Sequence, residues 1–412
     1  MIDWGALDAT AFHHALATGL GRALLHTRQH GRVPDEDALW DACLHCQTYN
    51  WELEGHRAAW LWSVVHEAGL AAHWAGPLLA ALPEATSVPD ADQLAGLALC
   101  IARTGHDGAA RALEAVLSSG PDPSLTVPGA RELVELQGIA GLHTVFRVVG
   151  GALRSGDERH LLGLGAWMMA VEDILGVDVV ANVLATSTDP GARAIREALA
   201  DENASADADT FAPDPLGPGE REALFTTVRA CATALAASRA PPLDAHDLAR
   251  ALARLGRQPP RSLDPILLAL DAHESARVRR QLSKLLSHVR HPLLRGLALQ
   301  GPLGHPDRLR WLLANFEHGD GQRVLAALDH PVSRDESYDR CAILLRLHAA
   351  HPAEGWDGAL VHVYQHAPCS LAREDALVRL LDDDAAPVWL VAEACWDAHP
   401  DVATAAREAL QA

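Results

Sequence analysis

Cysteine, histidine and tryptophan concentrate in one stretch, DACLHCQTYNWELEGHRAAWLW at residues 41–62. Cys43 and Cys46 stand at the spacing that supplies the first pair of ligands in many zinc sites. Such a site also needs a second tight pair, whereas His56 and His66 lie ten residues apart. On a helix both cysteines fall on the apolar side, where free cysteine commonly serves as a small hydrophobic residue. We therefore expect core cysteines, with metal or redox use as the alternative.

The next predicted helix, over residues 52–69, carries a charge on its apolar face. Arg57 falls at the centre of that face and needs a partner, because desolvation of an unpaired ion is costly. Glu54, nearly one helical turn earlier, is the expected partner in a salt bridge that locks the first helices together. The alternative is a pocket in which Arg57, beside a tryptophan, meets an anionic or planar ligand. Trp62 is expected to project away from the apolar face. The candidate binding residues of this segment are Trp51, Glu54, Arg57, Trp60 and Trp62.

A basic segment stands out in a chain whose formal charge is −20. From Arg239 to Arg310 the sequence has thirteen basic and six acidic residues, and helical spacing puts Arg277, Arg280 and Lys284 on one face. Such a stripe could bind phosphate backbones, but the segment has no Phe, Tyr or Trp on which bases could stack. The alternative is that its arginines pair with acidic residues of neighbouring helices. The candidate residues of the stripe are Arg277, Arg279, Arg280, Lys284, Arg290 and Arg295.

The remaining chemistry-bearing residues form no familiar catalytic pattern. The sequence lacks the glycine-rich phosphate loops, the H-E-x-x-H zinc motif and the G-x-S-x-G elbow. Pairs of histidines at helical spacing have no convincing third ligand; they are His26 with His30, His288 with His291, and His362 with His366. The acidic run Asp382–Asp384 is expected to cap a helix beginning near Ala386. We expect no cofactor and no metal site, and enzyme function is the less favoured interpretation.

The elements that position these residues are predicted to be helices. Apolar residues recur at intervals of three and four, and glycines stand where helices are expected to stop. Many predicted helices begin with a short signature of His or Asp, small residues or Pro, and then Arg. It occurs in HESARVRR (273–280), HPLLR (291–295) and HGDGQR (318–323). His or Asp in the turn can cap exposed amide groups, and Pro suits the first helical position.

Residues 270–301, LDAHESARVRRQLSKLLSHVRHPLLRGLALQG, resemble a HEAT repeat, and the likeness is clearest over 260–330. The segment QTYNWELEGHRAAWL also resembles the N-terminal part of bacterial HEAT-like proteins. The resemblance implies an α-solenoid of antiparallel helix pairs with degenerate repeats, and no activity comes with it.

Composition narrows the class of protein further. The longest apolar runs are too short to span a bilayer, no leader is readable at the start, and seven scattered cysteines describe no disulfide framework. We expect a cytoplasmic protein with an N-terminal helical region at 1–200, an acidic, proline-rich linker or loop at 201–219, and HEAT-like repeats at 220–412.

These observations favour a non-enzymatic scaffold that binds another protein. The first alternative is a nucleic-acid-binding or DNA-repair-type protein that uses the stripe at 277–295, which the negative charge of the chain disfavours. The second is a small-ligand pocket or an enzyme near Glu54 and Arg57.

Overall fold

The computed structural model of the chain describes residues 6–55, 57–119, 127–155, 164–205, 216–352 and 355–411. Within these ranges the secondary structure consists of 24 α-helices and short 3-10 helices, and no strand is present. The prediction of an all-α protein is confirmed. In the same ranges no helix is both long enough and apolar enough to span a bilayer.

The chain divides into two compact units, and unit 1 combines residues 1–210 with residues 387–412. Its helices are α1 (Ala9–Thr18), α2 (Arg22–His30), α3 (Glu36–Leu44), α4 (Trp51–Glu54), α5 (Ala58–Glu67), α6 (Ala71–Ala81), η1 (Leu82–Glu84), α7 (Val88–Arg103), α8 (Ala109–Ser119), α9 (Ala130–Gln137), α10 (Ile139–Arg154), α11 (Leu164–Leu175), α12 (Val177–Thr186), α13 (Pro190–Ser205), α23 (Val388–Ala394) and α24 (Pro400–Gln411).

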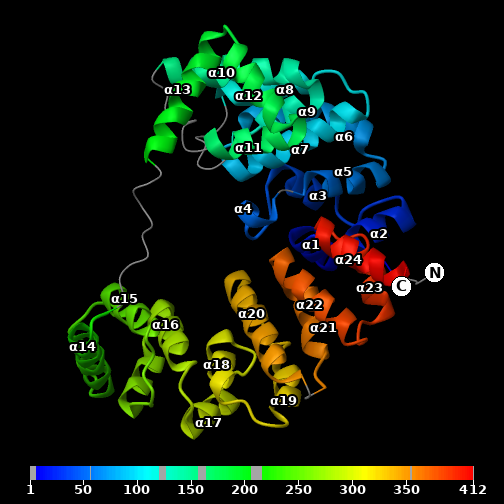
Figure 1. Cartoon of the computed structure of the whole chain (residues 1–412). Helices are drawn as coiled ribbons and strands as arrows, with labels where there is room; N and C mark the ends of the chain where they lie inside the picture. The colour runs from blue at the N-terminus through cyan, green and yellow to red at the C-terminus, as the bar shows by residue number, and fades with distance from the viewer. Residues whose placement is uncertain are drawn as a thin grey trace. The chain divides into compact units, whose positions relative to one another are not determined.

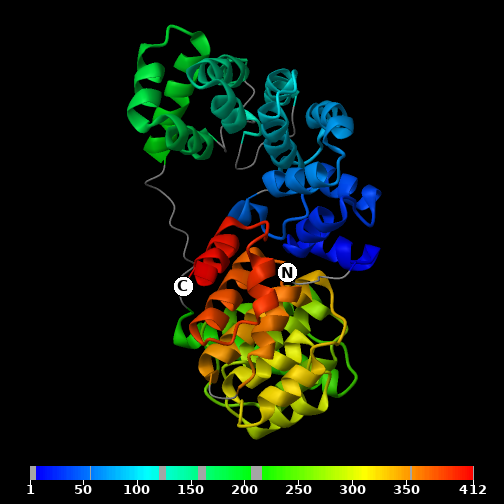
Figure 2. The ribbon, with the colours of Figure 1, turned by 90° about the vertical axis from the view of Figure 1, so that its right-hand side faces the viewer.

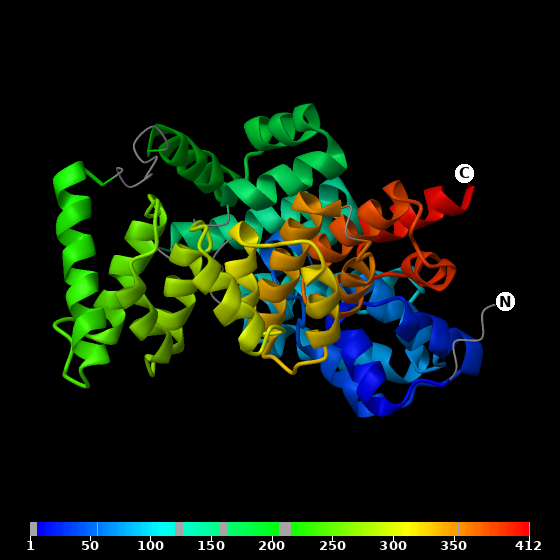
Figure 3. The same ribbon diagram turned by 90° about the horizontal axis from the view of Figure 1, so that it is seen from below.

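Unit 2 comprises residues 211–386. Its helices are α14 (Pro218–Ala236), α15 (Ala245–Gly256), η3 (Pro265–Ala272), α16 (Ala276–Leu286), α17 (Pro292–Gln300), α18 (Pro306–Trp311), η4 (Leu312–Ala314), α19 (Asp320–Ala327), α20 (Arg334–Ala350), α21 (Gly358–His366) and α22 (Ser370–Asp382). Helices adjacent in the sequence pack against each other, among them α15 with α16 and α21 with α22. Figure 3 shows them following one another from α14 in green through yellow to orange. The predicted division at 201–219 stays a prediction, and residues 206–215 lie outside the described part of the chain.

The two ends of the sequence meet inside unit 1, where α23 and α24 pack on the first helices (Figures 1 and 2). The Ala398 amide donates to the Gly19 carbonyl at 2.8 Å, and the Trp60 indole donates to the Trp396 carbonyl at 2.9 Å. At Gly21 the backbones come so close that a Cβ would lie 2.1 Å from the Glu393 carbonyl oxygen. Glycine is therefore required at this crossing.

The predicted signature at helix starts has the expected geometry in several places. His291 and His305 are the N-cap residues of α17 and α18, and each Nδ1 accepts from a backbone amide two residues on, at 3.2 Å. Asp189, before α13, accepts from the Gly191 amide at 2.7 Å. In all three cases Pro occupies the first helical position, where a missing N–H costs nothing. These caps are local, which is why the sequence could predict the one at His291. The cap at His305 follows the same pattern but was not among those predicted.

A second regularity concerns arginines that cap the helix before their own. The guanidinium groups of Arg196, Arg340 and Arg407 each donate to a carbonyl twelve residues earlier, at or just beyond the end of the preceding helix. The helix pairs are α12–α13, α19–α20 and α23–α24. A cation at this position satisfies carbonyls that have no partner within their helix, and it lies at the negative end of the helix dipole.

Candidate functional site

The CLHC segment that suggested a metal site ends α3 and is fixed by residues of α7. Cys43 is fully buried, and burial raises the pKa of its thiol to about 12, so the reactive thiolate is disfavoured. The Gln93 side-chain amide donates to the Cys43 carbonyl at 3.1 Å, and Asp90 accepts from the Cys46 amide at 2.7 Å. The prediction that both cysteines share one helix face was wrong for Cys46, because α3 ends two residues before it.

Arg57 does not lie on a continuous helix over 52–69, and that prediction was wrong. The helix is interrupted between α4 and α5 at Gly55, whose φ of 68° lies in the left-handed region. Arg57 is 8% exposed, and its Nη1 donates to the carbonyls of Leu16 at 3.3 Å and Ala17 at 2.8 Å. The guanidinium thus caps the end of α1, where a cation is favourable because the helix dipole is negative there.

The neighbouring candidates also participate in internal contacts. Glu54 accepts from the Asn50 amide at 2.9 Å, which begins α4. Trp60 and Trp62 are each only 7% exposed, so the expectation that Trp62 projects outward was wrong. Trp51 is half-buried. Binding by Trp51, Glu54, Arg57, Trp60 and Trp62 stays a prediction, and in the described residues this segment contributes mainly to the packing of α1, α5 and α23.

The basic stripe is divided between paired and unpaired residues. Arg295 makes a two-pronged contact with Asp320, at 3.0 and 2.8 Å, which raises the pKa of the guanidinium. Arg280 lies 3.7 Å from an Asp339 oxygen. Arg279 donates to the His273 and Glu274 carbonyls, and Arg277 lies 3.3 Å from a ring nitrogen of His246. Lys284 and Arg290 are exposed and take part in none of the ion pairs found in the described ranges.

Lys284 lines a cavity of about 380 Å³ in unit 2 that other basic residues share. The walls come from α15 and the residue after it, from α16 and the turn that follows, from α18 and from α20. The polar lining residues are Arg257, Gln281, Lys284, Ser287, His288, Arg310, Asp339 and Arg346. The apolar lining residues are Leu252, Ala253, Ala342 and Ile343, together with Gly256. We call this cavity the cationic pocket.

Three of the four helices that line the cationic pocket begin at side-chain caps, whereas α16 begins after Ser275 without one. Asp244 caps α15 by accepting from the Asp247 amide. His305 caps α18. At the start of α20, Ser333 and Glu336 form a reciprocal capping box, and its hydrogen bonds lower the pKa of the Glu336 carboxyl. The starts of α15, α18 and α20 are therefore fixed by local hydrogen bonds.

The single carboxylate in the lining, Asp339, is neutralised by arginines. Arg310 is 7% exposed, and its guanidinium contacts Asp339 at 3.1 Å and Asp307 at 3.4 Å. Burial raises the pKa of Asp307, while the charges of His305 and Arg310 act to lower it. Because Arg280 contacts the same Asp339 oxygen atom, two cations face one acid.

Three exposed cations at the pocket remain without an acidic partner. No ion pair in the described part of the chain involves Arg257, Lys284 or Arg346. His288, also exposed, adds a ring that can donate a hydrogen bond. The pocket therefore presents positive charge beside an apolar wall. This arrangement fits a ligand that is acidic and partly apolar.

The sequence pointed to Lys284 as a candidate but not to the residues that form the other walls of the cationic pocket. Arg257 and Arg310 belong to the basic segment, yet nothing in the sequence brings them to Lys284, and Arg346 lies outside that segment. One signal was available, because Asp339, Ala342 and Arg346 recur at helical spacing and share one face of α20. Only the packing of α20 on α18 shows what that face meets.

A second cavity of about 560 Å³ lies between α14 and the loop before η3. Its charges are largely balanced. Arg229 contacts Asp264 at 3.1 Å, and Arg221 donates to the Pro259 carbonyl at 3.4 Å. The cationic pocket is therefore the stronger candidate for binding a charged ligand.

Comparisons of the chain with protein-family models, with curated proteins and with solved structures found no match.

Proposed function

We propose that the chain is a non-enzymatic scaffold of HEAT-like helix pairs that binds another protein through an acidic segment held in the cationic pocket. The observation that carries this proposal is the set of three exposed cations, Arg257, Lys284 and Arg346, around a partly apolar cavity. Carboxylates of a partner would pair with these cations, while apolar side chains would contact Leu252 and Ile343.

The repeat architecture in this proposal is supported by two regularities. Several helices begin at the same His-Pro or Asp-Pro cap, and arginines at a constant twelve-residue separation cap the preceding helix in three pairs. Recurrence of one local unit is typical of solenoids, in which each helix pair buries its apolar face against its neighbours.

An acidic protein segment is favoured over nucleic acid for three reasons. Arg279, Arg280 and Arg295 are already occupied by internal partners. No Phe, Tyr or Trp lines the pocket, so bases would have no aromatic surface on which to stack. The formal charge of −20 repels every anion at long range, and it repels a nucleic acid, which carries a charge on every phosphate, more strongly than a segment with a few carboxylates.

The test uses defined probes. A fluorescein-labelled peptide of alternating Glu and Leu, and a single-stranded oligonucleotide of the same length, are titrated with the purified chain at several salt concentrations. Lys284→Ala and Arg346→Ala each remove one pocket cation. Arg290→Ala is the matched control, because Arg290 is exposed and lies in the same basic segment but does not line the pocket.

We expect saturable binding of the peptide to the wild type. Each pocket variant should raise the dissociation constant about fivefold to tenfold, because it removes one charge-assisted hydrogen bond. Arg290→Ala binds as the wild type does. Tighter binding of the oligonucleotide, with a salt dependence that the pocket variants reduce, would identify a nucleic-acid-binding protein instead. Equal weakening by all three variants would show a diffuse charge effect and would contradict the proposed site.

A further inference from the structure

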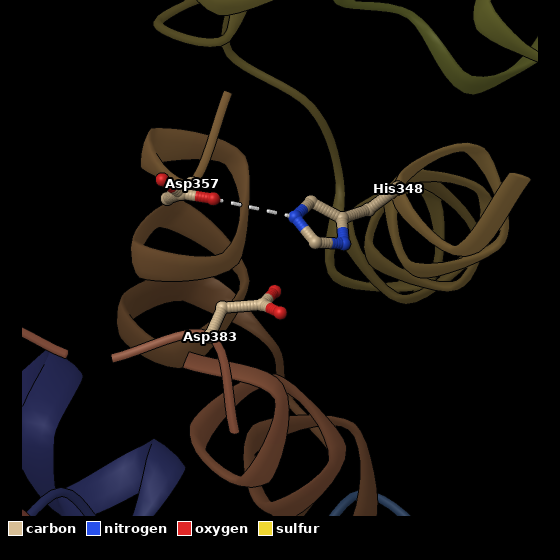
Figure 4. A group of neighbouring side chains, drawn as sticks. All are labelled: His348, Asp357 and Asp383. Atoms are coloured by element: carbon tan, nitrogen blue, oxygen red, sulfur yellow. Dashed lines mark ion pairs between the residues drawn. The ribbon is translucent and has the colours of Figure 1, made fainter. Parts of the chain in front are cut away.

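Three side chains that the sequence did not bring together converge at one corner of unit 2. His348 lies in the last turns of α20, Asp357 immediately precedes α21, and Asp383 immediately follows α22. One ligand atom from each, a ring nitrogen and two carboxylate oxygens, lie within 4.8 Å of one another. Figure 4 shows both carboxylates on the side of the imidazole that carries the marked nitrogen.

The imidazole of His348 is held in place with one nitrogen unsatisfied. Its side chain is 3% exposed, and its Nε2 is buried without a hydrogen-bond partner in the described part of the chain. The closest acidic atom, Asp357 Oδ1, lies 3.5 Å away, beyond ordinary hydrogen-bond length. The ring stacks near the fully buried Trp356, with 6.0 Å between centroids. Burial of a ring nitrogen without a hydrogen-bond partner destabilises the folded state unless a ligand contacts that nitrogen.

Asp357 has a position at which aspartate ordinarily caps a helix, but it does not do so. It is the N-cap residue of α21, and its side chain accepts no hydrogen bond from the first turn. Its carboxylate faces His348 instead (Figure 4). The Asp357 carboxylate therefore lies near the imidazole and does not make the capping hydrogen bond that would normally stabilise the start of α21.

Asp383 has an unfavourable position for a negative charge. The acidic run Asp382–Asp384 was expected to cap the following helix, but that prediction was wrong, because the run lies at the C-terminal end of α22. The helix dipole is negative there, so carboxylates are destabilising unless a cation is close. In the described ranges no basic side chain forms an ion pair with Asp383, which is exposed.

We propose that His348, Asp357 and Asp383 bind one divalent transition-metal ion, Zn²⁺ or Mn²⁺. The ion would satisfy the unpartnered His348 nitrogen and the carboxylate at the end of α22 at the same time. Imidazole nitrogen selects transition metals over Mg²⁺ and Ca²⁺, which prefer ligand sets made of oxygen alone. Three protein ligands leave at least one coordination position for water.

The geometry requires only a small adjustment. Ligand atoms about 2.0–2.2 Å from one Zn²⁺ ion stand roughly 3–3.6 Å from each other, and His348 Nε2 and Asp357 Oδ1 already lie 3.5 Å apart. The third ligand, Asp383, is exposed and can rotate toward the pair. The ion would tie the end of α20 to the start of α21 and the end of α22. The expectation of no metal site arose because the third ligand, Asp383, is separated in the sequence from His348 and Asp357 by the whole of α21 and α22.

The experiment measures metal binding by the full chain after treatment with a chelator. Ion content after equilibrium dialysis and the shift in unfolding temperature are determined for Zn²⁺, Mn²⁺, Mg²⁺ and Ca²⁺. Asp383→Asn removes an exposed ligand and leaves the core intact, and His348→Gln removes the nitrogen ligand. Asp382→Asn is the matched control, because it removes a neighbouring exposed charge from the same helix end but lies outside the three ligands.

The expected result is one bound Zn²⁺ or Mn²⁺ ion that raises the unfolding temperature of the wild type and of Asp382→Asn. In Asp383→Asn and His348→Gln the affinity falls at least about tenfold. Other histidines and cysteines can bind metal, so the difference between the two aspartate variants is decisive. Equal stoichiometry and affinity in Asp382→Asn and Asp383→Asn would overturn the proposal, as would preferential binding of Mg²⁺ or Ca²⁺.

Discussion

Arg57 illustrates how a residue that the sequence marks as a candidate for binding can also have a structural role in the fold. A guanidinium on an apolar helix face suggested a ligand or a local salt bridge with Glu54. The structure instead places it at the N-terminal boundary of α5, donating to carbonyls at the end of α1. These two carbonyls lie some forty residues earlier in the sequence, as the separation of 41 between Arg57 and Leu16 shows.

Replacement of Arg57 by alanine should therefore destabilise the protein. The change leaves two carbonyls at the end of α1 without a donor in a buried setting, and we expect a loss of about 2–4 kcal/mol in the free energy of unfolding. Urea denaturation followed by tryptophan fluorescence measures it. Arg32→Ala, at an exposed arginine of the same unit, is the control and should change stability little. A ligand-binding role without a structural one would leave the Arg57→Ala midpoint unchanged.

Glu132, in α9, makes stability depend on pH. Burial, and then the charge of Asp92, raise the pKa of its carboxyl from 4.5 to about 8. The folded state therefore binds a proton more tightly than the unfolded state does. The stabilising contribution of the protonated form is complete below pH 4.5 and is lost as the pH rises to about 8.

Glu132→Gln should accordingly stabilise the protein at pH 8 by about 1–3 kcal/mol, because glutamine is neutral at every pH. The gain should shrink toward pH 4.5. Unfolding curves at both pH values measure it, with the exposed Glu84→Gln as the reference. A gain that is the same at both pH values would contradict a raised pKa at this site.

At the scale of the elements, the contact between α2 and α23 depends on a glycine. Gly21 precedes α2, and a Cβ at this residue would lie only 2.1 Å from the Glu393 carbonyl oxygen. The same crossing buries the Glu393 side chain against Arg22 at 2.8 Å, and burial raises the pKa of that carboxyl despite the neighbouring cation. Close backbone approach and a buried ion pair therefore depend on the same few residues.

Gly21→Ala should separate α2 from α23 and destabilise unit 1 by about 2 kcal/mol or more, because the clash involves backbone atoms that cannot rotate away. Gly76→Ala is the matched control. Gly76 lies inside α6 with no atom near its missing Cβ, so alanine there should be neutral or slightly stabilising. Thermal unfolding of both variants compares them. A Gly21→Ala protein as stable as Gly76→Ala would show that the crossing adjusts freely.

At the scale of the whole molecule, charge is distributed unevenly. The chain has a formal charge of −20, yet the cationic pocket gathers arginines and a lysine from four elements of unit 2. The same unit contributes the three proposed metal ligands, and α20 takes part in both sites through Arg346 and His348. The two proposals can be tested separately, because no residue belongs to both.

The sequence by itself determined the features that arise within a few residues of each other. Helical periodicity predicted an all-α chain, and the His-Pro signature predicted the cap at His291, because a cap and its amide lie within one turn. The burial of Cys43 followed from its place on an apolar face. The interruption of the helix at Gly55 was missed, because the apolar spacing continues across this residue while the helical backbone conformation does not.

Only the tertiary structure decided which distant segments meet. The return of α23 and α24 to the first helices, the partners of Arg57, the walls of the cationic pocket and the meeting of His348 with Asp357 and Asp383 all join residues that are far apart in the sequence. Helical periodicity says which face of a helix is apolar, and many helices could cover that face equally well. The choice among them is made by the packing of specific side chains and by close backbone contacts such as the one at Gly21.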